Sequence, residues 1–458
     1  MSATRLQKWT MQIACVGALG MMATVSCGAN NAGIALLVQN IEAGTIRLEI
    51  TPFVGDKTLP REEFKDIQGA KDYVAGFQLP RAYVGQPVWF QVNAINSNEC
   101  VAQTVTTDKV NTESLRRYDV NAKLQTYGGD RVDNNIFDIH GSSGNNVWVV
   151  GDNKEVSRWN GCYWRSVPVP VEIPSFIKIF VPPATSTNSS VYAVSIDKIY
   201  KYDGTKWALD YDPKFASLPA EVNMVFAGIS GSSESDIWAV AGNKLALSAT
   251  QNNSVVLRRN MTGWSNDTSG GLPVVVENKI NAIHSINKTT ILVTGMNKMS
   301  EWFAARWTVG TWRLDQFTPR VTGSTAVSIW GMAYDDYWLG GTPAVIKQIQ
   351  QSATISKPDY DMIFGGGTGV NPNWRTARIG GVASDDFWVL AFTPIPMIES
   401  KIIHYVSGQW KTETELSKLA AQLTTFYVAG KDDVWFAGYG GVRIHYDGKT
   451  FTRATDRN

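Results

Sequence analysis

Short runs of apolar residues, separated by turn-forming residues, extend along most of the chain. Residues 46–50 (Ile-Arg-Leu-Glu-Ile) alternate apolar and polar side chains, as a strand with one buried face does. Residues 88–92 (Val-Trp-Phe-Gln-Val) are a second β run, and glycine, proline and asparagine lie between such runs. We therefore predict a small β-sandwich domain over residues 28–122.

The region after residue 122 is repetitive. An Asp or Asn precedes an apolar run around a tryptophan, and in four copies a glycine stands five residues before that Asp or Asn. Five copies are clear, and the spacing of these copies indicates two more. The central residues are Trp148, Tyr192, Trp238, Leu292, Trp338, Trp388 and Trp435, so the mean step is about 48 residues, close to the four-strand period of a propeller blade.

This period predicts an all-β fold in which residues 123–458 form a seven-bladed β-propeller. One sheet cannot bury its apolar faces alone, whereas sheets stacked in a ring bury them against each other. A second phrase follows most copies, as in Tyr202-Asp-Gly-Thr-Lys-Trp207, and Asp-Gly or Asn-Gly suits a two-residue hairpin because both central residues need a positive φ. Residues 124–127 (Leu-Gln-Thr-Tyr) could add an outer strand to the ring, so its closure stays open.

The repeats have the form Gly-Ser-Ser-x-x-Asp-Val-Trp-Ala-Val-Gly, followed by Trp-Asp-Gly-x-x-Trp. They resemble those of secreted and lipoprotein β-propellers of myxobacteria, and they are similar to sialidase-like and photosystem II assembly factor-like propellers. The resemblance covers roughly residues 128–458 and implies the fold, but it says almost nothing about function. In the first domain, Phe77-Gln-Leu-Pro80 and the strand around Trp89 resemble Ig-like or transthyretin-like modules.

The first 27 residues have the pattern of an export signal. Two basic residues precede an apolar stretch, residues 11–25, which is short for a membrane span and typical of a signal peptide. The sequence up to Cys27 resembles a bacterial lipobox, so we expect a lipoprotein anchored to the outer membrane or cell surface through Cys27. Thr24 departs from the lipobox pattern, which leaves plain cleavage near Ser26, with a periplasmic or secreted protein, and a retained N-terminal anchor as alternatives.

Cysteine usage and charge narrow the candidate chemistry. Cys100 and Cys162 remain after export, and an even pair in an oxidising compartment suggests one disulfide, with two separate thiols as the alternative. Neither belongs to a Cys-x-x-Cys motif, so we predict no metal site and no cofactor. The net charge is +1 and Lys and Arg form no long runs, so we predict no nucleic-acid partner.

Histidines, paired aspartates and most tryptophans fall inside the repeat. His140 and His284 share one repeat position, and His404 and His445 share another. Residues that recur in register are usually structural, so we assign no catalytic residue. A sialidase-like site would need an arginine cluster, for which the sequence offers Arg258, Arg259, Arg306, Arg375, Arg378 and Arg443.

Three tryptophans lie outside the main anchors of the repeat. We expect these to be the exposed aromatic residues of a binding surface: Trp302, Trp330 and Trp374. Together, the patterns predict a non-enzymatic binding or scaffolding lipoprotein that presents its propeller to a protein or glycan partner. The alternatives are a carbohydrate-active hydrolase or lyase that uses the propeller funnel, and a structural component of a surface assembly. The oligomeric state is not indicated.

The disulfide prediction can be tested on the exported protein. If Cys100 and Cys162 pair, a digest of the non-reduced protein contains one cross-linked peptide pair, and reduction separates it. Two alkylated thiols in the non-reduced, denatured protein would contradict the pairing.

Overall fold

The structure is a computed structural model, and the residues that it describes belong to two compact units, which adjoin in the sequence at residues 129–130. The described residues are 32–453, except 66, 68, 97–99, 114–115, 127–133, 184–189, 213–223, 244–253, 268–278, 298, 300, 316–324, 343–345, 351–352, 357–373, 394–398 and 414–421. The predicted signal and Cys27 lie outside this range. No helix among these residues is long and apolar enough to cross a bilayer.

The N-terminal unit contains two β-sheets. One has the order β5-β1-β9, with bounds β1 (Ala32–Gln39), β5 (Tyr73–Leu79) and β9 (Arg117–Lys123). The other has the order β10-β7-β6-β2-β3, with β4 beside β2 and β8 beside β6; its strands are β2 (Thr45–Val54), β3 (Lys57–Thr58), β4 (Glu62–Phe64), β6 (Pro87–Asn96), β7 (Val101–Thr106), β8 (Val110–Asn111) and β10 (Gln125–Thr126).

The two sheets of the N-terminal unit share one hydrophobic core. The two β runs seen in the sequence lie in β2 and β6, which pair antiparallel. Leu48 and Phe90 are buried in the core, together with Ile34 from the other sheet, whereas Trp89 stacks on Phe53 with the ring centres 5.4 Å apart. The alternation of buried and less buried residues along β6 therefore follows the two-residue period of a strand. The likeness to Ig-like or transthyretin-like modules stays a prediction.

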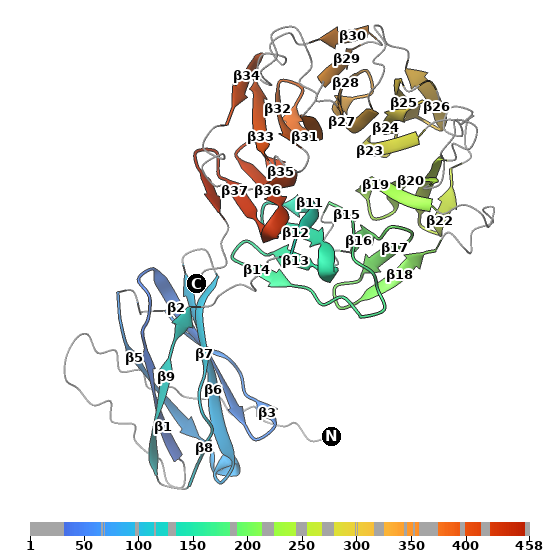
Figure 1. Ribbon diagram of the computed structural model, residues 1–458. Coiled ribbons are helices and arrows are strands. Elements are labelled where there is room, and N and C mark those ends of the chain that lie inside the picture. Colours follow the sequence, from blue (N-terminus) through green and yellow to red (C-terminus); the bar gives the residue numbers. More distant parts are fainter. Residues whose placement is uncertain are drawn as a thin grey trace. The chain divides into compact units, whose positions relative to one another are not determined.

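The described residues of the C-terminal unit form seven four-stranded antiparallel sheets, which we call blades 1 to 7 (Figure 1). Their strands are, in blade 1, β11 (Ile136–Ser143), β12 (Asn146–Gly151), β13 (Val156–Trp159) and β14 (Trp164–Ser166); in blade 2, β15 (Lys178–Phe180), β16 (Val191–Val194), β17 (Ile199–Tyr202) and β18 (Trp207–Tyr211); in blade 3, β19 (Met224–Ser233), β20 (Asp236–Asn243), β21 (Ser254–Asn260) and β22 (Gly263–Asn266); in blade 4, β23 (Lys279–Asn287), β24 (Thr290–Met296), β25 (Trp302–Thr308) and β26 (Thr311–Asp315); in blade 5, β27 (Thr325–Ala333), β28 (Asp336–Thr342), β29 (Ile346–Gln350) and β30 (Ala353–Ser356); in blade 6, β31 (Arg375–Ala383), β32 (Asp386–Phe392), β33 (Ser400–Val406) and β34 (Gln409–Thr412); and in blade 7, β35 (Leu423–Gly430), β36 (Asp433–Gly438), β37 (Arg443–Tyr446) and β38 (Phe451–Arg453). Short 3₁₀ helices occur at Arg81–Tyr83, Asp152–Lys154 and Tyr439–Gly441.

The blades form a closed ring, so the predicted β-propeller is confirmed. The innermost strand of each blade contacts those of its two neighbours, and β35 of blade 7 contacts β11 of blade 1 (Figure 1). Each anchor of the sequence repeat lies in the second strand of a different blade. All four strands of blade 7 come from residues 423–453, and the candidate outer strand β10 pairs instead with β7 of the N-terminal unit. The ring therefore closes without a strand shared between blades 1 and 7, through side-chain packing and through hydrogen bonds such as that from the Thr424 hydroxyl to the Ile136 carbonyl (2.8 Å).

The anchor aromatics make the contacts between neighbouring blades. Trp338 packs with Phe387 and Val389 of blade 6, and Trp388 packs with Phe426 and other apolar residues of blade 7. Trp435 in turn packs with Ile136 and further apolar side chains of blade 1. The same aromatic contact thus recurs around the ring and also closes it.

The hairpins between the third and fourth strands differ from the sequence prediction. In Tyr202–Trp207 the loop has four residues, and only Gly204 has a positive φ, 98°. The Asp203 carboxylate accepts hydrogen bonds from the backbone N–H groups of Thr205 (2.8 Å) and Lys206 (2.9 Å), so it closes the turn through its side chain. Two-residue loops with two positive φ values occur instead at Val309-Gly310 and Ser407-Gly408.

Both predicted disulfide cysteines, Cys100 and Cys162, are disulfide-bonded in the structure. This agrees with an oxidising compartment. Their pairing with each other stays a prediction, for which the peptide digest is the test.

The glycine that opens the repeat phrase is required by space. At Gly381 a Cβ atom would lie 2.3 Å from Cβ of Phe387 and 2.6 Å from the backbone oxygen of Asp386, at a bulge between β31 and β32. Because neither neighbour is a flexible side-chain end, an added methyl group would force the two strands apart.

We therefore expect Gly381→Ala to lower the free energy of unfolding by about 2 kcal/mol. The measurement is urea unfolding of the full chain, followed by tryptophan fluorescence. Gly430→Ala is the matched control, because its Cβ would meet nothing closer than 3.9 Å, and we expect a change within about 0.5 kcal/mol. Equal losses in both variants would contradict the steric explanation.

Candidate functional site

The recurring polar residues of the repeat contact each other. In blade 3, the Trp238 indole N–H donates to Asp236 (3.1 Å), and Arg258 donates to the same carboxylate oxygen (3.3 Å) while its guanidinium lies 4.7 Å from the indole ring centre. The Asp236 carboxylate also accepts a hydrogen bond from Ser232 across the hairpin turn. The Asp or Asn of the repeat thus holds both the anchor tryptophan and the turn before it.

Histidine replaces the arginine in blades 6 and 7. The His404 ring stacks on Trp388 with centres 3.9 Å apart, and its Nε2 donates to Asp386 at 2.7 Å. His445, Trp435 and Asp433 repeat this arrangement, with the corresponding distances 4.2 and 2.8 Å. The interpretation of these histidines and paired aspartates as structural residues agrees with these contacts.

The prediction that three tryptophans are exposed is wrong. Trp302, Trp330 and Trp374 are 3%, 6% and 8% exposed. Trp302 packs with Leu292 and Leu339 between blades 4 and 5, whereas Trp330 and Trp374 pack in the cluster between blades 5 and 6. Their positions differ from the anchors in sequence, but they also fill the space between neighbouring sheets.

The centre of the propeller contains a cavity of about 320 Å³, which we call the channel. Its lining comes from the innermost strands of all seven blades. In each blade, one inner-strand residue pairs with the anchor of the second strand, and these residues form what we call the aromatic level: His140, Phe180, Ser230, His284, Trp330, Gly380 and Tyr427. Five of the seven carry a ring, and four of these five residues, all except Phe180, line the cavity.

A second level lies two residues earlier on the same strands. This charged level consists of Asp138, Lys178, Gly228, Ala282, Ser328, Arg378 and Thr425. Small residues occupy four of the seven positions, whereas blades 1, 2 and 6 contribute one charged residue each. Unlike the anchors, these residues differ from blade to blade.

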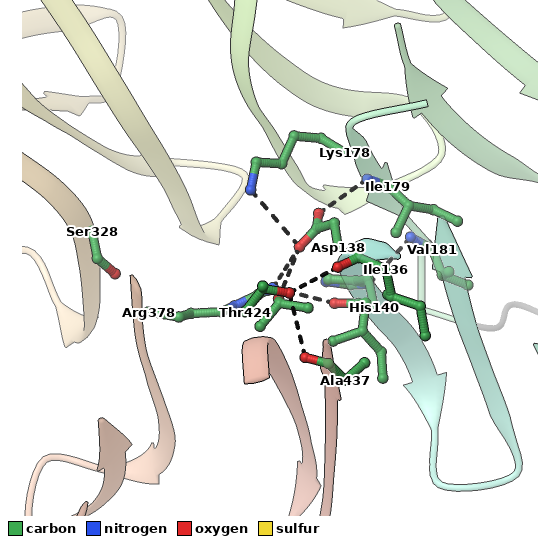
Figure 2. Close-up of polar contacts among 12 residues, drawn as sticks. Ile136, Asp138, His140, Lys178, Ile179, Val181, Ser328, Arg378, Thr424 and Ala437 are labelled. Atoms are coloured by element: carbon green, nitrogen blue, oxygen red, sulfur yellow. Dashed lines mark hydrogen bonds and ion pairs between the residues drawn. The ribbon is translucent and has the colours of Figure 1, made fainter. Parts of the chain in front are cut away.

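Asp138 connects the charged residues across the channel (Figure 2). Its carboxylate accepts hydrogen bonds from Arg378 (2.7 Å), from the Thr425 hydroxyl (3.2 Å) and from the Ile179 backbone N–H (3.1 Å), and Nζ of Lys178 lies 3.9 Å away. Burial alone would raise the pKa of Asp138, but the charges of Lys178 and Arg378 and the Ile179 N–H outweigh it, so the pKa is lowered. Asp138 therefore stays ionised and links blades 1, 2, 6 and 7.

Both channel histidines are neutral near pH 7. Burial, together with the charge of Arg378, lowers the pKa of His140 to about 3, and burial lowers the pKa of His284 to about 4. Nδ1 of His140 accepts a hydrogen bond from the Val181 N–H (3.2 Å), so its proton sits on Nε2. Nε2 of His284 donates to the Gly331 carbonyl (3.0 Å). The charged residues of the lining are Asp138, Lys178 and Arg378, which leave a net charge of +1.

Of the six arginines considered for a sialidase-like cluster, Arg378 alone lines the described part of the channel. Arg443 is buried beside Glu155, and Arg306 pairs with Asp315. Within the described residues, no group of three or more His, Cys, Asp or Glu side chains could hold a metal ion.

Sequence reasoning did not single out Asp138, Lys178 or Thr425. The sequence does contain a signal for them. Two residues before the repeat position of His140 and His284, three blades carry a charged residue and the other four carry a small one. It could be found only after alignment of the inner strands, where blade 2 has a very short strand, β15.

No protein-family model matches the sequence, and no curated protein matches it. Among solved structures, the chain is similar to YCF48 bound to a D1 peptide (TM-score 0.48, 10% identity, over 70% of this chain and 95% of that chain). It is similar to YCF48 from Cyanidioschyzon merolae (TM-score 0.48, 12% identity, 70% and 98%) and to a puromycin hydrolase mutant complexed with PGG (TM-score 0.48, 11% identity, 71% and 54%). At such low identity, none of these similarities assigns a function or a site residue to this chain.

The network around Asp138 generates a stability prediction. Asp138→Asn leaves Arg378 without its carboxylate, so we expect the free energy of unfolding to fall by about 3 kcal/mol at pH 7. Folding lowers the pKa of Asp138 from its ordinary value of 3.8. The difference in the free energy of unfolding between the wild type and Asp138→Asn is therefore complete above pH 3.8 and shrinks as the pH falls below that value. Denaturant unfolding of the full chain between pH 7 and pH 3 measures it.

Arg375→Gln is the control for this variant, because Arg375 is exposed on the same strand as Arg378. We expect a change within about 0.5 kcal/mol. A loss in Asp138→Asn that is equally small, or that does not depend on pH, would contradict the assigned role of Asp138.

Proposed function

We propose that this protein is a non-enzymatic binding or scaffolding protein of the bacterial cell envelope, and that its partner binds at the channel of the propeller. One observation carries this proposal. The residues that recur in the repeat are engaged in contacts within and between blades, whereas the channel levels differ from blade to blade. The channel is a concave site with convergent polar and charged groups, and concave sites in which a few placed polar groups fix orientation are typical of ligand binding.

The chemistry of the channel favours binding over hydrolysis. Paired-carboxylate hydrolysis needs one carboxylic acid with a raised pKa and a second carboxylate. Asp138 is the one carboxylate in the described lining, its pKa is lowered, and it is held by three hydrogen bonds. The described lining therefore lacks the second carboxylate and the raised pKa that the hydrolase alternative needs.

The N-terminal part supplies the location in this proposal. A signal peptide over residues 1–27 directs export, a lipid on Cys27 tethers the protein to the outer membrane or cell surface, and the N-terminal unit acts as a spacer. The partner is a protein, with a glycan as the second candidate. Two disulfide-bonded cysteines support an extracytoplasmic location.

The binding proposal is tested by filling the channel. Ser230 lines the cavity at the aromatic level, where blade 7 carries Tyr427, so this repeat position accommodates a large ring at the cavity. We expect Ser230→Tyr to abolish capture of envelope proteins by the purified protein, as identified by mass spectrometry after crosslinking. Ser235→Tyr, on the exposed turn of the same blade, is the control and should capture the same proteins as the wild type. Equal capture by both variants would overturn the assignment of the site.

The tether is tested separately. Mass spectrometry of the mature protein should find an acylated N-terminal Cys27, and Cys27→Ser should release the protein from the membrane fraction. An unmodified Cys27 in a freely secreted protein would overturn the tether without affecting the binding site.

A further inference from the structure

We propose that the channel recognises a carboxylate on an extended polypeptide segment of the partner, an acidic side chain or a C-terminus, and that Lys178 and Arg378 bind it. This inference rests on the proposed binding function and names the chemistry that the channel selects. Within the described residues, Lys178 and Arg378 have N–H donors that bind no acceptor.

Lys178 forms an ion pair with Asp138 but no hydrogen bond to a described residue. Its Nζ lies 3.9 Å from the Asp138 carboxylate, which is beyond hydrogen-bond distance, and its side chain is 38% exposed at the channel. In the described part of the chain, no acceptor takes a hydrogen bond from this ammonium group. An ammonium has three N–H donors, so Lys178 can bind an anion without losing an existing hydrogen bond.

Arg378 has donors to spare as well. Its three hydrogen bonds within the described residues come from Nη1, which donates to Asp138, to the Ile139 carbonyl and to Thr425. The side chain is 29% exposed, and within the described residues neither Nε nor Nη2 has an acceptor. Asp138 thus fixes one edge of the guanidinium and leaves the other edge for a ligand, which suits the fork geometry of a carboxylate.

The aromatic level adds neutral donors. His140 carries its proton on Nε2, because Nδ1 accepts from Val181, and burial raises the pKa of Tyr427, so its hydroxyl keeps its proton. Neither group has a recorded acceptor among the described residues. The described lining thus has two cations but one carboxylate, and His140 and Tyr427 add an N–H and an O–H donor. An anion would supply the acceptors that these donors lack.

The geometry favours a polypeptide carboxylate over a sugar acid. Sugar rings bind on exposed flat faces of aromatic residues, but Trp330 is buried and packs against Phe387 with ring centres 5.6 Å apart. The His140 ring lies tilted between Phe180 and Tyr427, at 5.2 and 5.3 Å. A cavity of about 320 Å³ is at the small end of ligand sites, and a carboxylate on a flexible chain needs no stacking platform.

The probes for the test are N-acetyl-Ala-Ala-Ala with a free C-terminal carboxylate, the same peptide as its C-terminal amide, glucuronate and inorganic phosphate. Binding to the full-length mature protein is measured by isothermal titration calorimetry. We expect the acid peptide to bind at least tenfold more tightly than the amide, glucuronate or phosphate. Equal binding of acid and amide overturns the carboxylate assignment, and tighter binding of glucuronate or phosphate overturns the choice of a polypeptide.

Lys178→Gln should weaken binding of the acid peptide at least tenfold. Its matched control is Lys279→Gln, since Lys279 is exposed on an innermost strand but does not line the cavity, and we expect binding unchanged. The thermal midpoint of Lys178→Gln checks that it is folded, and Arg378→Lys, which keeps the charge beside Asp138, gives a second measurement with an expected intermediate loss. Unchanged affinity in both Lys178→Gln and Arg378→Lys overturns the inference.

The failure of this inference is distinguishable from that of the proposed function. If Ser230→Tyr abolishes capture of envelope proteins while Lys178→Gln captures them as the wild type does, the channel binds a partner by other chemistry and only the carboxylate inference fails. If neither variant changes capture, the proposed binding site itself fails.

Discussion

A ring of sheets is stable only if each sheet buries both of its faces, and in this propeller the packing of one large side chain per blade against the next blade meets that requirement. Trp388 packs into blade 7, and Trp435 packs against blade 1, so the contact that joins neighbours also joins the two ends of the ring. Fully burying a large aromatic side chain contributes about 3 kcal/mol. Blades 1 and 7 share no strand, so side-chain contacts such as that of Trp435 with Ile136 hold the two ends of the ring together.

The aromatic anchors also engage the polar side chains that recur in the repeat. An indole N–H and a nearby cation need an acceptor when they are buried, and the Asp or Asn of the repeat provides one in blades 1 and 3. His404 and His445 serve the same stack in blades 6 and 7. The recurring Asp and His residues of these blades are therefore engaged in packing and orientation, whereas the innermost strands differ from blade to blade.

At the centre of the ring, the electrostatics follow from one buried carboxylate. Asp138 offsets one of the two cations that face it, so the channel has only a small positive charge. Burial lowers the pKa of both channel histidines and keeps them neutral. Burying a cation without a counter-charge costs free energy. Because Lys178 and Arg378 share the carboxylate of Asp138, this cost is reduced while some of their N–H donors stay available. The same network bridges blades 6, 7, 1 and 2, so the charged groups of the described lining gather around the place where the ring closes.

The repeat in the sequence was sufficient to predict the propeller, because a period of about 48 residues and an aromatic anchor are local properties. It predicted a structural role for all four histidines, with which the contacts of His404 and His445 agree, whereas His140 and His284 line the channel. It also predicted the role of Gly381, since a close backbone approach depends on residues five positions away. Only the tertiary structure showed that Trp302, Trp330 and Trp374 are buried, because an aromatic residue that is not a repeat anchor can still pack between neighbouring blades. It alone also brought Asp138 and Arg378 together, 240 residues apart, because only ring closure makes the two ends of the propeller neighbours.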